Sequence, residues 1–415
     1  METVHVYTAS WLYNPGFAPE PGGGIAVQNG RIVAAGSGAD LVSRYGPATA
    51  DYPGAVLMPG FVNAHTHLEL SHFPAWRCRD GLDYHPHRFV DWIVQMIKVR
   101  RGVSPEELLT SLKAGIAISV RSGTTAVGDI VTSPALLAAY AGSRLGGRLY
   151  LELIGQERES FQERLEQALS ATTALPVDRG WGLSPHAPYT LHRSLLPLIA
   201  SAATDASLPL SLHMAESREE SDFLMTGDGA FAEELYPLVG WQAFIPPPQQ
   251  ISAAGYFDAG GLLGETTLAV HCVQVSEADV ELLARRRSAI CLCPRSNERL
   301  SVGTAPVSLF KKWGITLCLG TDSLASNDSL SLWDECRFAV DQYGGWVTPE
   351  ELLVMATRGG ACGLGIAHDT GSLEVGRRAD LQVVDLQGGI CTPEQLMDRG
   401  RVIDCLCGGE RYSSE

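Results

Sequence analysis

The sequence predicts an α/β fold, a (β/α)8 TIM-like barrel with a small β-sandwich domain built from both chain ends. Three observations support this prediction. Eight short apolar runs alternate with amphipathic segments in the middle of the chain, both ends have the texture of short strands with tight turns, and polar residues follow the apolar runs. Alternating strands and helices are typical of a parallel sheet, and eight such units allow the sheet to close on itself.

The two ends of the chain are rich in predicted strands. Asn29 and Gly30 lie between apolar alternations in GGGIAVQNGRIVAAG, which is a strong signal for a two-residue β-hairpin. Similar segments, GSLEVGRRADLQVVDLQ and RVIDCLCGGERY, occur near the other end. We therefore predict one small domain formed by residues 1–57 and 366–415, with the barrel spanning residues 58–365.

The apolar runs of the predicted barrel are separated by helical segments, such as residues 104–123 and 159–175. A doubly wound open sheet is the alternative architecture. Closure is favoured because polar residues gather at the C-terminal ends of the runs, where a barrel has its active site. The eight runs are MPGFVNAH, GTTAVGDI, GRLYLELIG, GWGLSPHA, LPLSLHMAE, TLAVHCV, SAICLCP and ITLCLGTD.

Composition excludes several classes of protein. The 415 residues include 31 Lys+Arg and 47 Asp+Glu, a formal net charge of −16, which argues against binding to a nucleic-acid backbone. No segment approaches the roughly 20 apolar residues of a membrane span, and the first residues do not predict a signal peptide. The 10 cysteines follow no disulfide framework. We expect a reduced, cytoplasmic protein that binds neither membranes nor nucleic acid.

His65 and His67 are the first candidate metal ligands. They end the first apolar run, and side chains two positions apart on a strand point to the same side. Two neutral imidazoles on one side suit a divalent metal ion. Three further runs also end in histidine and the last run ends in aspartate, so a barrel would bring all of these groups to one rim: His186, His213, His271 and Asp322.

Two carboxylates accompany these histidines. Glu216 lies three residues after His213, where ESREES opens a helix. It is either a helix N-terminal acid stabilised by the helix dipole or a general base that moves a proton between water and a leaving amine. Glu69 continues the alternation of residues 65 and 67, so we expect it to face the pocket, in contact with substrate or with a metal ligand.

These motifs resemble the amidohydrolase superfamily. The resemblance rests on PGFVNAHTHLELS, SPHAPYT, SLHMAES, AVHC and GTDSLASNDSLSLWDE, and it spans nearly the whole chain. Within the superfamily, the chain is similar to the mononuclear aminohydrolase and chlorohydrolase branch. No lysine falls at a strand end, where a binuclear relative would need one. The HTHLELS stretch looks most like the aminofutalosine deaminases of menaquinone biosynthesis.

The resemblance implies a set of site residues. Asp322 would also accept a proton from water, Glu216 would carry a proton to the leaving group, and His271 would hold the attacking water. His186 and Glu69 are the expected substrate contacts. One Zn²⁺ or Fe²⁺ per chain would be held by His65, His67, His213 and Asp322.

The implied reaction is hydrolytic deamination of an amidine-like carbon in a nitrogen heterocycle. The best substrate candidate is 6-amino-6-deoxyfutalosine, an aminopurine nucleoside with an aromatic carboxylate tail. Arg144 and Arg148 are either partners of that carboxylate or surface residues. The alternatives are another nucleoside or nucleobase deaminase acting on S-adenosylhomocysteine, adenosine or guanine, a chlorohydrolase, and a non-catalytic metal-binding protein. Relatives are often homodimers, but no sequence feature locates an interface.

Overall fold

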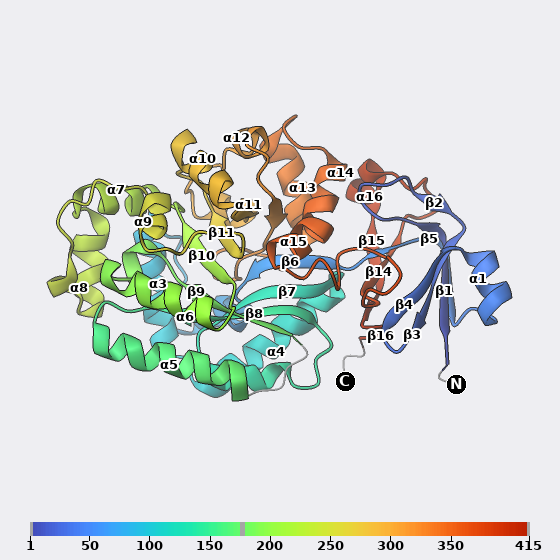
Figure 1. The fold of residues 1–415 in the computed structure, drawn as a ribbon, viewed down its shortest axis with the longest axis horizontal. Coiled ribbons are helices and arrows are strands. Elements are labelled where there is room, and N and C mark those ends of the chain that lie inside the picture. Colours follow the sequence, from blue (N-terminus) through green and yellow to red (C-terminus); the bar gives the residue numbers. More distant parts are fainter. Residues whose placement is uncertain (1–2, 175–178, 413–415) are drawn as a thin grey trace.

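The computed structural model of the protein describes residues 3–174 and 179–412, and the strands of these ranges form two separate sheets. One is a parallel sheet from the middle of the chain, and the other is a mixed sheet with strands from both ends. Figure 1 shows the barrel, coloured from lighter blue through green to orange, on one side and the dark blue and red strands of the mixed sheet on the other. The predicted fold class is confirmed.

Each of the eight apolar runs contains one barrel strand. The strands follow one another in chain order, and neighbouring strands pair in parallel. The ring closes where Thr66, at the end of the first strand, forms a parallel bridge with Asp322, just after the last. The barrel strands are β6 (Phe61–Thr66), β7 (Thr124–Val131), β8 (Gly146–Leu153), β9 (Gly180–Pro185), β10 (Leu210–Met214), β11 (Thr267–His271), β12 (Ala289–Leu292) and β13 (Leu317–Leu319).

The mixed sheet joins the two ends of the chain through its central strand, β5. This strand pairs in parallel with β1 and antiparallel with β14, so an early and a late segment share one sheet. Its strands are β1 (His5–Leu12), β2 (Glu20–Pro21), β3 (Gly23–Gln28), β4 (Arg31–Ser37), β5 (Ala50–Pro59), β14 (Leu381–Asp385), β15 (Arg401–Cys407) and β16 (Glu410–Arg411).

The predicted hairpin at Asn29-Gly30 is confirmed. Gln28 pairs with Arg31 across the turn, and both turn residues have positive φ angles, 54° and 72°. This is the conformation that an Asn-Gly pair adopts easily. Along β5, pairing with β14 continues to Pro59, and β6 begins at Phe61. The domain boundaries at 57/58 and 365/366 stay predictions.

The helices largely connect consecutive barrel strands. The segment predicted at 104–123 forms α4, which begins after a capping box between Ser104 and Glu107, and the segment predicted at 159–175 forms α5; residue 175 lies outside the described residues. The α-helices are α1 (Gly38–Tyr45), α2 (Phe73–Arg79), α3 (Phe89–Arg101), α4 (Pro105–Arg121), α5 (Arg158–Ala174), α6 (Leu196–Asp205), α7 (Arg218–Thr226), α8 (Tyr236–Val239), α9 (Ala253–Ala259), α10 (Glu277–Arg286), α11 (Pro294–Arg299), α12 (Val307–Lys312), α13 (Leu332–Tyr343), α14 (Pro349–Val354), α15 (Gly360–Gly363) and α16 (Pro393–Arg399).

Short helices of other types occur in several connections. Two of them are π-helical turns, η5 (Phe231–Leu235) and η7 (Met355–Gly359). The 3-10 turns are η1 (Leu68–Leu70), η2 (Pro134–Tyr140), η3 (Pro188–Thr190), η4 (Arg193–Leu195) and η6 (Gln242–Phe244).

Apolar side chains fill the interior of the barrel. A buried cluster joins residues of several barrel strands with the short helix α15, so the barrel is a packed core and not a pore. Polar chemistry is therefore left to the rim formed by the C-terminal strand ends. The cluster includes Val62, Ala64, Ile130, Tyr150, Val270 and Cys318.

Two further observations concern the state of the cysteines and the length of the helices. The 10 cysteines all lie in the described part of the chain and are free thiols. Among the helices of the described residues, none is long and apolar enough to span a membrane.

Candidate metal centre and active site

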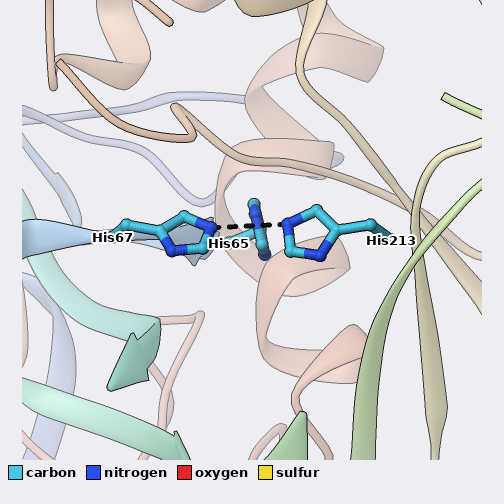
Figure 2. Close-up of side chains that lie close together, drawn as sticks. All are labelled: His65, His67 and His213. Carbon is cyan, nitrogen blue, oxygen red and sulfur yellow. Dashed lines mark hydrogen bonds between the residues drawn. The ribbon is translucent and has the colours of Figure 1, made fainter. Parts of the chain in front are cut away.

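Three histidines from two barrel strands converge at the rim. His65 lies in β6, His67 follows that strand directly, and His213 lies near the end of β10. Their candidate ligand atoms all lie within 4.8 Å of one another. Figure 2 shows His67 and His213 facing each other with His65 between them, and the two facing Nε2 atoms are 3.4 Å apart. Three converging imidazoles are a donor set that suits a divalent cation.

The protonation of these histidines fits a metal ion. Burial lowers the pKa of His67 to about 3, and burial and the neighbouring imidazoles hold the pKa of His213 well below its ordinary value. Nδ1 of His213 donates to the backbone carbonyl of His186 at 3.0 Å, which leaves its Nε2 with a free lone pair. Among the described residues, neither ring nitrogen of the buried His65 has a hydrogen-bond partner. Neutral imidazoles with unused lone pairs are the form that binds a metal.

Asp322 completes the group of four predicted ligands. Its Oδ1 lies 3.6 Å from Nε2 of His65 and 3.6 Å from Nε2 of His67. Its Oδ2 accepts hydrogen bonds from the hydroxyls of Ser296 (2.7 Å) and Ser326 (2.5 Å). Burial would raise the pKa of Asp322, but the interactions with His65, His67 and His271 outweigh burial and hold that pKa well below its ordinary value. Asp322 is thus an anion with one oxygen fixed and the other turned toward the histidines.

Glu216 lies in the turn between β10 and α7. The carboxylate of Glu220 accepts hydrogen bonds from the backbone N–H groups of Ala215 (2.8 Å) and Glu216 (3.0 Å). These bonds hold Ala215 at φ 51°, a left-handed conformation that residues other than glycine rarely adopt. Burial, followed by the nearby charges of Asp322 and Glu220, raises the pKa of Glu216 well above its ordinary value. Burial therefore favours the protonated form of the Glu216 carboxyl group.

His271 ends β11 beside Glu216. Its Nε2 lies 3.6 Å from Oε1 of Glu216 and has no hydrogen-bond partner among the described residues. Its Nδ1 lies 2.9 Å from Oδ1 of Asn297, an acceptor that requires the ring proton on Nδ1. Burial lowers the pKa of His271 to about 4. The geometry therefore directs a neutral imidazole with its Nε2 lone pair toward Glu216.

His186 follows β9 and packs against the cluster, with its ring centroid 4.8 Å from that of His213. Its Nδ1 lies 3.0 Å from the hydroxyl oxygen of Thr190, which itself donates to the carbonyl of Ala187. The hydroxyl proton is thus used, so Nδ1 of His186 is the donor and its Nε2 is free to accept. Burial lowers the pKa of His186 to about 4.

A cavity of about 420 Å³ adjoins the cluster, a size typical of sites for small molecules. One part of its lining is polar and carries six of the residues discussed above: His67, His186, His213, Glu216, His271 and Asp322. Another part is apolar and comes mainly from α3 and the segment around α8. Its residues include Trp92, Met96, Ile97, Leu235, Val239 and Trp241.

Glu69 also lines the cavity, but strand alternation is not what directs it there. The strand ends at Thr66, and Glu69 lies in the 3-10 turn η1. Both carboxylate oxygens are engaged by Thr132, one by its backbone N–H (3.1 Å) and one by its hydroxyl (2.7 Å).

Arg144 and Arg148 do not line the cavity. Arg144 forms an exposed ion pair with Glu410 at 2.5 Å, and Arg148, near the start of β8, donates to the backbone carbonyls of Leu364 and Trp181. Arg100 and Arg101, at the end of α3, are the arginines of the cavity lining. Of the two interpretations left open for these arginines, the cavity lining does not support contact with a substrate carboxylate, because both lie at the amino end of their strand.

Several polar residues around the cluster were not among the residues predicted from the sequence. The rule that polar residues follow barrel strands would have found three of them if applied to the second, third and seventh runs. These are Asp129 in β7, Glu152 in β8 and Asn297 in the α11 turn after β12. Ser326 and Glu220 carry no comparable signal, since each acts through contacts that only the folded chain makes.

Comparison with known proteins decides the family. The model described as "Amidohydrolase family" matches residues 56–411. The chain belongs to the amidohydrolase family. Family membership, together with the deaminases among its relatives, makes this amidohydrolase a hydrolase that acts on carbon–nitrogen bonds.

Two characterised relatives and one solved structure illustrate the similarity. An aminodeoxyfutalosine deaminase of Deinococcus radiodurans is 31% identical over 376 residues, covering 85% of this chain and 84% of the relative. A 5-methylthioadenosine/S-adenosylhomocysteine deaminase of Pelotomaculum thermopropionicum is 30% identical over 385 residues, covering 88% and 80%. The structure of an adenosine deaminase from Xanthomonas campestris with bound zinc superposes with a TM-score of 0.83 at 25% identity, covering 98% of this chain and 92% of that one.

Proposed function

We propose that this amidohydrolase is a metal-dependent hydrolytic deaminase of an aminopurine nucleoside, and that its substrate is 6-amino-6-deoxyfutalosine. The observation that carries the proposal is the gathering of three histidines, Asp322, Glu216 and His271 around one cavity at the barrel rim. With that substrate, the products are futalosine and ammonia, and the enzyme acts in menaquinone biosynthesis in the cytoplasm.

In this proposal, one divalent metal ion, Zn²⁺ or Fe²⁺, is held by His65, His67, His213 and Asp322. The zinc in the related adenosine deaminase structure supports the choice of a divalent ion. When bound, such an ion supplies a Lewis acid that generates a nucleophile from water near neutral pH. The absence of a lysine at the strand ends favours a single ion.

In this proposal, side chains of the protein accept and donate the protons of the reaction. Oδ1 of Asp322 is free to accept a proton from water, because Oδ2 is held by Ser296 and Ser326. Nε2 of His271 accepts a hydrogen bond from that water and orients it. The protonated carboxyl group of Glu216 lies beside His271 and donates its proton to the ring nitrogen or to the leaving amine.

The atoms of the reaction balance with water as the co-reactant. The water oxygen bonds to the carbon that carries the amino group, and the carbon–nitrogen bond to that amino group breaks. Ammonia leaves with the proton supplied by Glu216, and the proton accepted by Asp322 restores the carboxyl group. The second proton of the water passes from the hydroxyl oxygen to the ring nitrogen, so the ring keeps a carbonyl in place of the amine. His186 and Glu69 contribute to the substrate side of the cavity, His186 by accepting a hydrogen bond at Nε2.

The names of the relatives support the substrate class. The proteins from D. radiodurans and P. thermopropionicum are named for aminopurine nucleosides, and both align with more than four fifths of this chain. The cavity combines a polar wall with an apolar wall, as an aminopurine nucleoside with an aromatic substituent requires.

Ammonia release tests the proposal directly. The purified, zinc-loaded enzyme would be given 6-amino-6-deoxyfutalosine, 5′-methylthioadenosine, S-adenosylhomocysteine, adenosine and guanine, with a chlorotriazine assayed for chloride. We expect the highest kcat/KM with 6-amino-6-deoxyfutalosine. Preference for another aminopurine nucleoside would overturn the substrate, and release of chloride without ammonia from any nucleoside would overturn the reaction.

A further inference from the structure

One wall of the cavity, at the ends of β7 and β8, carries charged groups that the proposed chemistry does not use. Glu152 from β8, Arg100 from α3 and Thr132, which follows β7, all line the cavity. They come from α3, from β8 and from the residue after β7, whereas the four predicted metal ligands lie in or just after β6, β10 and β13. The wall therefore faces a part of the substrate other than the reacting carbon.

Within residues 3–174 and 179–412, the carboxyl group of Glu152 makes no hydrogen bond or ion pair. The charges of Glu69, Arg100 and Arg164 act on it only at longer range. A half-buried carboxyl group without a partner is costly, because it loses water without gaining a replacement. The group is thus available to a ligand that enters the cavity.

Arg100, in contrast, is held in place. Nη2 of Arg100 lies 3.6 Å from Oε1 of Glu69 and 3.4 Å from the hydroxyl oxygen of Thr132. Thr132 in turn donates to Glu69 through both its backbone N–H and its hydroxyl. A guanidinium has five N–H donors, so this anchoring leaves others for a ligand. Glu69 thereby helps to fix the position of the Arg100 side chain.

The charges of this wall favour a neutral ligand group. An anion bound beside Arg100 would also face Glu69 and Glu152, and a cation bound beside Glu152 would face Arg100. Burial raises the pKa of Glu152 to about 8; Glu69 adds to that rise, and Arg100 and Arg164 oppose it. A carboxyl group in this range both donates and accepts near neutral pH, which matches a hydroxyl group.

We propose that Glu152 and Arg100 form a second subsite of the cavity, which binds the vicinal 2′- and 3′-hydroxyl groups of the substrate's sugar. A vicinal pair fits because two neighbouring hydroxyls can meet two neighbouring side chains. The assignment rests on the proposed function, since it takes the substrate to be a nucleoside. It makes Glu152 and Arg100 determinants of specificity for nucleosides over analogues without the diol.

Three nucleosides with the same purine separate this role from a structural one. Ammonia release from adenosine, 5′-deoxyadenosine and 2′,3′-dideoxyadenosine is measured for the wild type, Glu152→Ala, Glu152→Gln and the exposed control Glu163→Gln. We expect the wild type and the control to prefer the two diol-bearing nucleosides by about 10- to 100-fold in kcat/KM, the range of a hydrogen bond to a charged or strongly polar group.

The variants should change that preference in a defined way. In Glu152→Ala the ratio should fall to about one, mainly through KM of adenosine and 5′-deoxyadenosine, and Glu152→Gln should retain most of it because an amide also donates and accepts. An unchanged ratio in Glu152→Ala would overturn the subsite, as would an equal loss for all three nucleosides.

The test also separates the subsite from the proposed function. If the wild type released ammonia from no nucleoside, including 6-amino-6-deoxyfutalosine, the proposed function would fail. Dissociation constants of the same three nucleosides for the zinc-loaded protein would then decide the subsite. A diol preference that Glu152→Ala abolishes supports it, and binding without such a preference, or no binding, overturns it.

Discussion

The side-chain oxygen of Asn297 lies 2.9 Å from Nδ1 of His271. The preceding residue, Ser296, donates to Oδ2 of Asp322. Two consecutive residues at the start of α11 therefore orient the two groups that we propose to hold water and to accept its proton. Partners of this kind fix the tautomer and the rotation of a site histidine.

Replacing Asn297 should impair orientation without removing a metal ligand. We expect Asn297→Leu to lower kcat about 10- to 100-fold, since losses of this size follow removal of such supporting hydrogen bonds. Asn297→Asp, which keeps an acceptor for Nδ1, should lose less. Steady-state kinetics with metal analysis checks this, and loss of bound metal in Asn297→Leu at unchanged stability would contradict the positioning role.

Glu216→Gln should remove the proton donor while leaving the site intact. The amide has the shape of the protonated carboxyl group but cannot transfer a proton, so we expect kcat to fall by about 10²- to 10⁴-fold with metal content near one per chain. The exposed neighbour variant Glu233→Gln serves as a matched control. Substantial turnover by Glu216→Gln would show that another group moves the proton.

Asp322→Asn should affect both activity and metal retention. The substitution preserves the hydrogen bonds from Ser296 and Ser326 to one side-chain atom but removes the negative charge that faces His65 and His67. We expect lower metal content after dialysis against a chelator and a melting temperature that no longer rises on adding zinc. Metal analysis of the wild type is part of the same experiment, and two ions per chain would contradict a mononuclear site.

Asp129 should make the stability of the protein depend on pH. It is fully buried, it accepts hydrogen bonds from the backbone of Leu68 (2.9 Å) and the hydroxyl of Tyr140, and burial raises its pKa to about 8 despite these bonds. The folded protein keeps this proton where the unfolded chain releases it. The protonated carboxyl group of Asp129 therefore contributes its full amount to the free energy of unfolding below about pH 4, and this contribution is lost as the pH rises to about 8.

Asp129→Asn isolates this effect, because its amide mimics the protonated carboxyl group. Between about pH 4 and 8, the free energy of unfolding of the wild type should fall relative to that of Asp129→Asn by up to about 1.4 kcal/mol per pH unit. Urea unfolding at several pH values measures the difference. Parallel pH profiles for the two proteins would mean that Asp129 is ionised in the folded state.

Much of the fold could be predicted because parallel barrel strands are buried on both faces. Such strands appear in the sequence as short apolar runs, and all eight runs contain a strand. The histidines were identifiable for a related reason: side chains at the C-terminal ends of parallel strands meet at one rim, so His65 and His213 could be associated although 148 positions separate them.

Other features of the site depend on contacts that no periodic pattern in the sequence predicts. Arg100 lies on a helix outside the barrel, and it reaches the cavity only because Glu69 and Thr132 hold its guanidinium. The position of Glu69 itself depends on a 3-10 turn, which strand alternation does not predict. Arg144 and Arg148 were close to the third run in sequence, but proximity along the chain does not distinguish the two ends of a strand.

The bridge between Thr66 and Asp322 joins residues 256 positions apart, and it lies at the cluster itself. A nascent polypeptide presents the His65–His67 pair early in translation, while the aspartate leaves the ribosome only after the eighth strand has been made. Until then the Thr66–Asp322 bridge cannot form and the predicted ligand set lacks its aspartate. Formation of the proposed metal site is thereby tied to completion of the barrel, because the residue that closes the ring against Thr66 is also the last predicted ligand along the chain.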